Sequence, residues 1–317
     1  MSVSESQLKG PSANVRQRHL SNQAIVNLFI WPTLLLLILM NVFPLFYSLY
    51  LGFTNYSAIA QKAPLWIAFQ NFSTILNDKN LWQYFATTGR YALMSVSMQV
   101  LVGFGLAMLV REKFKGGGIL TTLILIPMMI SPVVVGLFWK LMYNPTFGFF
   151  NALLGFSDPS LSPDWLASRF AGHPVPGLAL IAVVIVDVWM WAPFVMLLVL
   201  SGLKAIPDYL YEAAAVDRAS SWFQFWRITL PQVAPLLLIA VLFRTIEAFK
   251  SFDLVMGMTG GGPGVQTELI SVDLYRIAFL GQFRTGYGSA LAYIILIIII
   301  AISNLYIKYL NKSKGEG

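Results

Sequence analysis

One long apolar stretch of this sequence, residues 175–203, contains a carboxylate among aromatic residues. Asp187 is the single charged residue in that stretch, and "VDVWMWAPF" places Trp189, Trp191 and Phe194 just after it. Aromatic rings stack on the C–H faces of sugars, and carboxylates accept hydrogen bonds from sugar hydroxyls, so this composition suits a sugar site. Trp189 and Trp191 cannot share one helix face, so at most one lines a solute path. An interfacial aromatic belt is the competing interpretation.

A second apolar stretch contains four charged residues within "FRTIEAFKSFD". Arg244, Glu247, Lys250 and Asp253 recur every three residues with alternating sign, so they drift along one side of a helix. A charge within a membrane span costs about 2.5–3.5 kcal/mol on insertion scales, and such residues therefore mark interiors or pathways. We weigh an ion-pair ladder that holds helices together against Arg244, Glu247 and Lys250 beside a hydrophilic solute path. Both interpretations can hold at once.

Residues for catalysis or metal binding are scarce. The chain has no cysteine, and its two histidines, His19 and His173, lie in polar sequence away from other ligand types, so we expect no metal site. Neither a nucleophile–base pattern nor a Walker sequence occurs, and no Gly-Lys-Ser/Thr follows the glycine-rich "MTGGGPGVQTE" (Met258–Glu268). We therefore expect no catalytic residues, and any ATP-derived energy must come from another subunit.

The composition is that of an integral membrane protein. The chain is 57% hydrophobic and 11% charged, whereas soluble domains carry about 25% charged residues. Its mean hydropathy is +0.70. The net charge of +7 could suggest nucleic acid, but the basic residues are spread over the ends of apolar runs, so we expect no nucleic-acid partner. Residues 1–23 lack the apolar core of a cleavable signal peptide, and we interpret the first apolar run as a retained span.

Apolar runs of about 20 residues predict an all-α membrane protein with about six transmembrane helices. Pro127 and Pro132 predict a kink in the third of them. The domain organisation is then a tail over 1–23, a transmembrane domain over 24–311 and a tail over 312–317. The expected spans are about 25–52, 88–110, 118–143, 175–203, 232–256 and 288–311.

The distribution of lysine and arginine predicts the orientation. With the N-terminus in the cytoplasm, twelve basic residues fall in or beside the inner segments and seven in or beside the longer outer segments, which span about 54–87, 144–174 and 257–287. This bias predicts a multi-pass protein of the cytoplasmic membrane with both termini in the cytoplasm.

The segment 207–231, "PDYLYEAAAVDRASSWFQFWRITLP", then lies at the cytoplasmic surface. It predicts a small-faced helix over Tyr209–Val216, begun by Pro207, and a second short helix capped by Ser220 or Ser221. The second helix has an aromatic face that includes Trp222 and Trp226. A pair of interfacial helices in contact with membrane lipid and a docking element for another protein remain alternatives.

The same segment resembles the EAA motif of binding-protein-dependent ABC importer permeases. The family pattern is Glu-Ala-Ala, three residues, Gly, nine residues, Ile, one residue, Leu-Pro. Arg218 stands where the family usually has glycine, which predicts an ordinary backbone conformation there or a different docking contact. The matching residues are Glu212, Ala213, Ala214, Ile228, Leu230 and Pro231.

The resemblance extends from about Leu28 to Tyr309. Within the family, the chain resembles the carbohydrate-uptake, maltose-type branch of these permeases. This resemblance rests also on "SGLKAIP" (Ser201–Pro207), "FKSFDLVMGMTGGGP" (Phe249–Pro263) and "ILIPMMISPVVVGLFWKLMYNPTFGFFN" (Ile124–Asn151). The resemblance implies that the chain forms half of the path for a sugar, an oligosaccharide or a related polyol or sugar derivative. An ion-gradient-driven secondary transporter that uses the intramembrane carboxylates is the alternative.

The resemblance also implies the partners. The coupling segment would dock in a cleft of a dimeric ATP-binding subunit, which holds the ATP and magnesium, and a second, different permease would complete the path. An extracytoplasmic solute-binding protein would deliver the solute. The glycine-rich loop would be a mobile outer cap or part of the surface on which that protein docks. A plain surface turn is the alternative interpretation of the loop. The coupling residues are Glu212, Ala213, Ala214, Asp217 and Arg218.

By position, maltose-type permeases also imply which residues line the solute path. In these permeases the path runs along the fourth span, just before its Pro-aromatic pair, and along the fifth span after the EAA motif. The implied residues are Asp187, Trp191, Phe194, Arg244, Glu247 and Lys250.

Overall fold

A computed structural model of the protein describes residues 21–60, 63–112, 114–156, 158 and 160–313. The chain divides between Tyr50 and Leu51 into two compact units. The first unit contains α1 (Asn22–Leu37), the π-helix η1 (Ile38–Val42) and most of α2 (Phe43–Gly52). Of the tails expected over 1–23 and 312–317, residues 1–20 and 314–317 lie outside the described residues.

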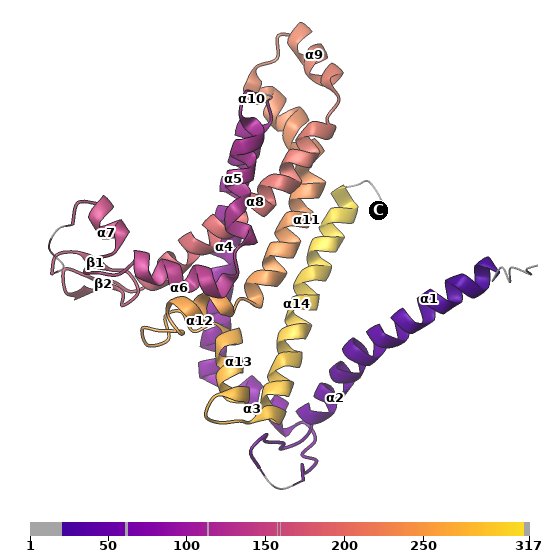
Figure 1. Ribbon diagram of the computed structural model, residues 1–317, viewed down its shortest axis with the longest axis vertical. Helices are drawn as coiled ribbons and strands as arrows, with labels where there is room; N and C mark the ends of the chain where they lie inside the picture. The colour runs from indigo at the N-terminus through magenta and orange to yellow at the C-terminus, as the bar shows by residue number, and fades with distance from the viewer. Residues whose placement is uncertain (1–20, 61–62, 113, 157, 159, 314–317) are drawn as a thin grey trace, which may run out of the picture. The chain divides into compact units, whose positions relative to one another are not determined.

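The second unit is helical apart from one small antiparallel sheet of strand order β1-β2-β3 (Figure 1). This sheet lies within the expected outer loop 144–174. The elements in chain order are α3 (Gln70–Asn77), α4 (Lys79–Val110), α5 (Gly117–Met129), α6 (Pro132–Met142), α7 (Phe149–Leu153), β1 (Pro163–Asp164), β2 (Arg169–Phe170), β3 (His173–Pro174), α8 (Leu178–Ala205), α9 (Asp208–Val216), α10 (Ser221–Gln224), the π-helix η2 (Phe225–Thr229), α11 (Leu230–Phe249), α12 (Asp253–Met258), α13 (Ile270–Phe279) and α14 (Thr285–Ser313).

Five helical segments of the described chain are long and apolar enough to cross a membrane, or six if a bent pair counts as one span. The expected all-α membrane fold is confirmed. The five segments are Val26–Gly52, Lys79–Val110, Leu178–Ala205, Ser221–Phe249 and Thr285–Asn311.

The expected third span is the bent pair, and its bend is larger than a proline kink. Helices α5 and α6 meet at an angle of 97°. Ile130 and Ser131 between them adopt extended conformations, with ψ of 142° and 133°. The residue before a proline avoids the helical region, so Pro132 ends one helix at Ser131 and begins the next.

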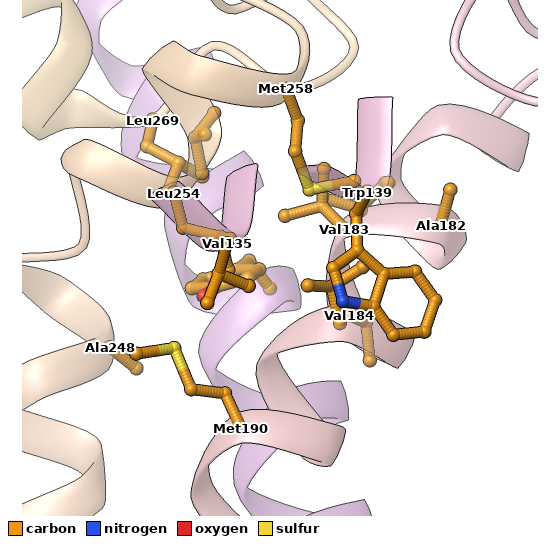
Figure 2. Close-up of a cluster of buried hydrophobic side chains, with 14 of the residues drawn as sticks. Val135, Trp139, Ala182, Val183, Val184, Met190, Ala248, Leu254, Met258 and Leu269 are labelled. Atoms are coloured by element: carbon orange, nitrogen blue, oxygen red, sulfur yellow. The ribbon is translucent and has the colours of Figure 1, made fainter. Parts of the chain in front are cut away.

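The main core of the second unit lies between α4, α6, α8 and α12. Figure 2 shows Val135 and Trp139 of α6 gathered with Val183 of α8 and Leu254 of α12. Two glycines permit this packing, because a Cβ on Gly136 would lie 2.9 Å from the Leu254 carbonyl oxygen. A Cβ on Gly103 would lie 2.6 Å from the carbonyl oxygen of Ala192, so α4 and α8 approach to backbone contact.

The fifth span differs from its expected limits at both ends. Helices α10, η2 and α11 form one continuous segment, Ser221–Phe249, so the second helix of the expected coupling pair is the start of the span. Pro231 does not interrupt it, because proline is tolerated in a first turn and the wider π-turn before it bonds the Leu230 N–H to the Phe225 carbonyl. The span ends at Phe249, before the expected 256, because the helix breaks over residues 250–252.

Candidate functional site

A buried polar network crosses the interior of the helical unit. Asp187 of α8 and Arg244 of α11 are each 3% exposed, and the Arg244 Nη2 lies 3.5 Å from the Asp187 Oδ1. The Arg244 Nε donates to the Gln99 Oε1 at 2.8 Å, and the Gln99 Nε2 donates to the Asp187 Oδ2 at 2.7 Å. Ser95 also donates to Asp187, and the Arg244 guanidinium lies 4.5 Å from the centre of the Trp191 ring. Two charges can remain buried here because each has partners.

Gln99 and Ser95 were not predicted as site residues, although both are fully buried on α4. Their spacing of four residues places them on one face of the helix. The sequence does contain a signal: an amide and a hydroxyl one turn apart in an apolar span indicate a face turned to the protein interior.

A cavity of about 110 Å³ lies beside this network, and its wall combines α8, α11 and the break after α11. Five of the six predicted pathway residues line it. They are Asp187, Trp191, Arg244, Glu247 and Lys250, and they are joined by Pro132, Ser251, Phe252, Asp253 and Leu254.

Phe194 lies outside this cavity. It packs instead against a second apolar cluster that includes Val195 and Leu203 of α8 and Val233 of α11. Phe194 lies on the same side of α8 as Asp187, but seven residues further along the helix, a rise of about 10 Å that carries it beyond the cavity. Trp189 also lies apart from the cavity and contacts the Trp139 ring at 5.3 Å between centroids.

The four charges of the second stretch do not form a ladder on one helix. Arg244 turns inward to Asp187, whereas Glu247 and Lys250 form a half-exposed pair with 2.8 Å between Oε1 and Nζ. Asp253 begins a separate helix, α12. The three-residue spacing suggested a ladder, but α11 ends at Phe249, so Lys250 and Asp253 lie beyond its last residue.

Helix α9, which contains the first residues of the EAA pattern, projects from one end of the long helices and is followed in the chain by α10 (Figure 1). Ala214 is buried, while Glu212, Ala213, Asp217 and Arg218 are exposed. The expected cap is present at Ser220, whose hydroxyl accepts from the Phe223 N–H at 3.3 Å.

Tyr211 holds α9 against the ends of two long helices. Its hydroxyl lies 2.9 Å from the Thr229 hydroxyl in η2, and Arg111, just after α4, lies over its ring at 4.6 Å. The exposed face of α9 is therefore presented from a fixed base.

Arg218 adopts a left-handed conformation with φ of 55°, so the prediction of an ordinary backbone there is wrong. The Arg218 N–H bonds to the Ala215 carbonyl, and the Ala219 N–H bonds to the Ala214 carbonyl at 2.9 Å. These two bonds form a Schellman motif, whose left-handed position is usually glycine. The backbone geometry at this position is thus the one that glycine favours, and arginine adopts it with steric strain in its backbone.

We expect Arg218→Gly to stabilise the protein by about 0.5–1 kcal/mol, because the strain of a left-handed arginine exceeds the entropy that glycine loses. Chemical unfolding in detergent measures the change. Arg227→Gly is the matched control and should destabilise by about 1 kcal/mol, because Arg227 lies inside the continuous helix. A loss of stability in Arg218→Gly would show that the arginine side chain contributes more than its backbone costs.

Hydrogen bonds cross the glycine-rich loop 258–268, which favours a fixed shape over a mobile cap. The Thr267 hydroxyl lies 2.7 Å from both the Gly262 carbonyl oxygen and the Thr259 hydroxyl. Arg276 of α13 donates to the Gly260 carbonyl and pairs with the buried Glu268 at 2.9 Å.

Asp273 of α13 makes the stability of this region depend on pH. Its Oδ2 is buried and has no hydrogen-bond partner among the described residues. Burial raises the pKa of Asp273 from 3.8 to about 6, against the lowering effect of Arg276 and with a small contribution from Asp78. The folded protein therefore binds this proton more tightly than the unfolded chain, and stability falls as pH rises through about 6.

We expect Asp273→Asn to raise the Tm above that of wild type at pH 7.5, with a much smaller difference at pH 4. The amide keeps the shape of the side chain but removes the charge that becomes costly at the higher pH. Thermal unfolding at the two pH values measures both differences. An equal shift at both values would show that ionisation of Asp273 is not the cause.

Helices that span a membrane, a charged network inside them and an exposed helical projection define a membrane transport protein. The chain belongs to the family of binding-protein-dependent transport system inner membrane components, which its residues 99–315 match. It is therefore a multi-pass membrane permease subunit of an ABC importer, and ATP is hydrolysed by a separate subunit. This family membership does not favour the alternative of an ion-gradient-driven secondary transporter.

Several relatives are ABC transporter permeases. The trehalose/maltose transport system permease protein MalF of Thermococcus litoralis is 39% identical over 222 residues, which cover 70% of this chain and 72% of that protein. The probable ABC transporter permease protein y4oQ of Sinorhizobium fredii is 34% identical over 96% of this chain and 95% of its own. The trehalose transport system permease protein SugA of Mycobacterium tuberculosis is 30% identical over 94% of this chain and 92% of its own.

The fold is also that of a solved importer. A crystal structure of a bacterial ABC transporter that imports the acidic polysaccharide alginate contains a chain with a TM-score of 0.75 and 20% identity. The match covers 91% of this chain and 95% of that one.

Proposed function

We propose that this permease forms half of the path through which an ATP-driven importer takes up a sugar, an oligosaccharide or a related derivative. The observation that carries the proposal is the cavity beside Asp187, Trp191 and Arg244, where an aromatic face, a carboxylate and a cation meet inside the membrane-spanning helices. Aromatic faces and hydrogen-bonding side chains are the groups that recognise sugars. The names of the relatives from Thermococcus and Mycobacterium, which transport trehalose or maltose, support this class of solute.

The cavity is small for an intact sugar at about 110 Å³, whereas ligand sites usually have about 300–1,000 Å³. A second permease would supply the facing wall of the path, and we propose a different chain in that role. Glu247 and Lys250 at the rim would then meet the solute first, and the Asp187–Arg244 pair would form the floor of the site.

We propose that α9 docks on a dimeric ATP-binding subunit, which holds ATP and magnesium. The exposed Ala213 and Ala215 present little bulk, so a partner can approach this part of the helix closely, and the exposed Glu212 offers a charge for recognition. Arg111, Lys204 and Arg227 lie near this end of the helices, and the excess of basic residues supports a cytoplasmic location for α9 and for both termini. A solute-binding protein would act on the opposite side, where the loop 258–268 is part of its dock.

Reconstitution tests the proposal. The tagged chain is purified in mild detergent with its associated subunits, and uptake of radiolabelled maltose and trehalose is measured in proteoliposomes with ATP inside. We expect an ATP-binding subunit and a second permease to co-purify, and uptake to require both ATP and the binding protein. Uptake driven by a proton or sodium gradient without ATP would contradict the proposal. Uptake of amino acids or inorganic ions in place of sugars would contradict the solute class alone.

A further inference from the structure

A second polar cavity lies between residues 55–57, helix α3 and the start of α14. Its volume is about 360 Å³, which is within the range of small-molecule sites. Helix α3 precedes the first residue of α4, whereas Arg111 after the last residue of α4 contacts α9. The cavity and the projecting α9 therefore lie at opposite ends of a helix about 48 Å long (Figure 1).

Backbone hydrogen bonds hold the walls of this cavity together. The Gly286 N–H bonds to the Tyr56 carbonyl at 2.8 Å, and the Ala58 N–H bonds to the Phe283 carbonyl at 3.2 Å. A Cβ on Gly286 would lie 2.3 Å from the Thr54 carbonyl oxygen, so the two segments are in backbone contact. These two walls of the cavity are therefore fixed to one another.

The cavity presents one cation and several unused hydrogen-bonding groups. The Arg284 guanidinium lies 4.2 Å from the centre of the buried Tyr287 ring, which holds it in place. Within the described part of the chain, Arg284 forms no ion pair, and the side chains of Ser57 and Gln70 have no hydrogen-bond partner. No acidic residue lines the cavity. This set suits an anion with several oxygen atoms, because a guanidinium binds phosphate through two parallel hydrogen bonds.

An apolar rim adjoins the cavity. Leu65, Trp66 and Phe69 are each more than 60% exposed, and the rings of Trp66 and Phe69 lie 5.3 and 5.2 Å from the ring of Phe53. Residues 65–69 are continuous with Gln70 in the cavity wall. Exposed aromatic and aliphatic side chains at the end of membrane-spanning helices are typical of the layer where headgroups meet acyl chains.

We propose that this cavity binds the phosphate of an anionic phospholipid headgroup in the leaflet opposite α9, with the acyl chains over Leu65, Trp66 and Phe69. A free phosphate would leave the apolar rim unused. A neutral sugar would leave the charge of Arg284 unpaired, and Arg284 covers the Tyr287 face on which a sugar ring could stack. A zwitterionic headgroup would bring an ammonium group into a cavity whose lining has no carboxylate to receive it.

Thermal unfolding of the assembled importer in mild detergent tests this site, with added phosphatidylglycerol as the probe. Arg284→Gln removes the charge, Arg284→Lys restores it, and Arg169→Gln is a matched control at an exposed arginine of strand β2. We expect the lipid to raise the Tm of wild type, Arg284→Lys and Arg169→Gln. Arg284→Gln should need about tenfold more lipid for the same shift, because a charge-assisted bond to phosphate is lost.

Four other results would overturn the proposal. Inorganic phosphate could reproduce the shift, which would make the cavity a site for free anions. Phosphatidylcholine could match phosphatidylglycerol, which would remove the preference for an anionic headgroup. Maltose could produce a shift that Arg284→Gln abolishes, which would make the cavity a solute site. Finally, Arg284→Gln could respond to phosphatidylglycerol as wild type does. The Tm without added lipid shows whether Arg284→Gln is folded. If it is not, Gln70→Ala carries the test, because it removes a hydrogen-bonding group from the same cavity wall and should also need more lipid for the same shift.

Discussion

Replacing Glu212 with alanine is expected to reduce ATP-driven uptake about thirtyfold or more while leaving the fold of the permease unchanged. The Glu212 side chain is exposed on α9 and forms no ion pair with the described residues. Its removal should therefore cost the isolated chain little. In the assembled importer, the proposed contact would bury this carboxylate against the ATP-binding subunit, and loss of one partner of a buried charge pair costs about 2–5 kcal/mol. Binding-protein-stimulated ATP hydrolysis and uptake in proteoliposomes measure the effect.

Glu112→Ala is the matched control for this variant. Glu112 follows α4 at the same end of the helices as α9, and its side chain is 84% exposed. Its only ion pair in the described part of the chain is a long contact of 3.9 Å with Arg111, which such exposure makes weak. We expect Glu112→Ala to transport at nearly the wild-type rate. Equal losses in both variants would point to a general charge effect and would contradict a specific role for Glu212.

Replacing Arg244 with methionine is expected to lower the free energy of unfolding by about 3–5 kcal/mol, because the carboxyl group of Asp187 would be left in a buried position without its cation. Gln99 would lose its partner at the same time, since its Oε1 accepts from Arg244. Lys250→Met removes a cation from an ion pair that is about half exposed, and should change stability by less than about 1 kcal/mol. Unfolding by denaturant in detergent micelles measures both variants.

The double variant Arg244→Met with Asp187→Asn separates stability from transport. Asparagine removes the unpaired charge and retains hydrogen bonds to Ser95 and Gln99, so most of the lost stability should return. Transport should remain impaired, because the cavity would lose both charges that we assign to the solute path. Recovery of uptake together with stability would show that the pair only holds α8 to α11. A double variant as unstable as Arg244→Met would show that the arginine acts by packing on Trp191.

Hydropathy and the EAA spacing predicted the membrane-spanning helices and the segment that projects from them, because both depend on residues close together in the chain. The partners of Asp187 could not be identified in this way. Arg244 and Gln99 are 57 and 88 residues away from it, and only the packing of three helices brings them together. The sequence showed that each of these residues was costly in a membrane but not which of them would pair.

Proline was the least reliable guide to the ends of helices. Pro132 ends one helix and begins another at 97°, whereas Pro231 lies within a continuous helix. The difference depends on the preceding backbone. Ser131 is extended before Pro132. Before Pro231, a π-turn bonds the Leu230 N–H to the Phe225 carbonyl, so the helix continues although proline has no N–H to donate. The same arrangement occurs at Pro44, where η1 ends two residues earlier and the Phe43 N–H bonds to the Ile38 carbonyl. Neither backbone conformation is evident from composition.

The continuity of Ser221–Phe249 gives the permease a lever. Arg244 lies 23 residues after Ser221, the first residue of this helical rod, which is about 35 Å at the rise of an α-helix. A tilt of the rod by ten degrees about its Arg244 end would sweep the Ser221 end through about 6 Å. Conversely, a few ångströms of travel at that end would turn the Arg244 guanidinium by only a small angle. A contact held at 3.5 Å with Asp187 is sensitive to turns of that size. The long arm would thus convert a coarse movement outside the membrane into a fine adjustment at its centre.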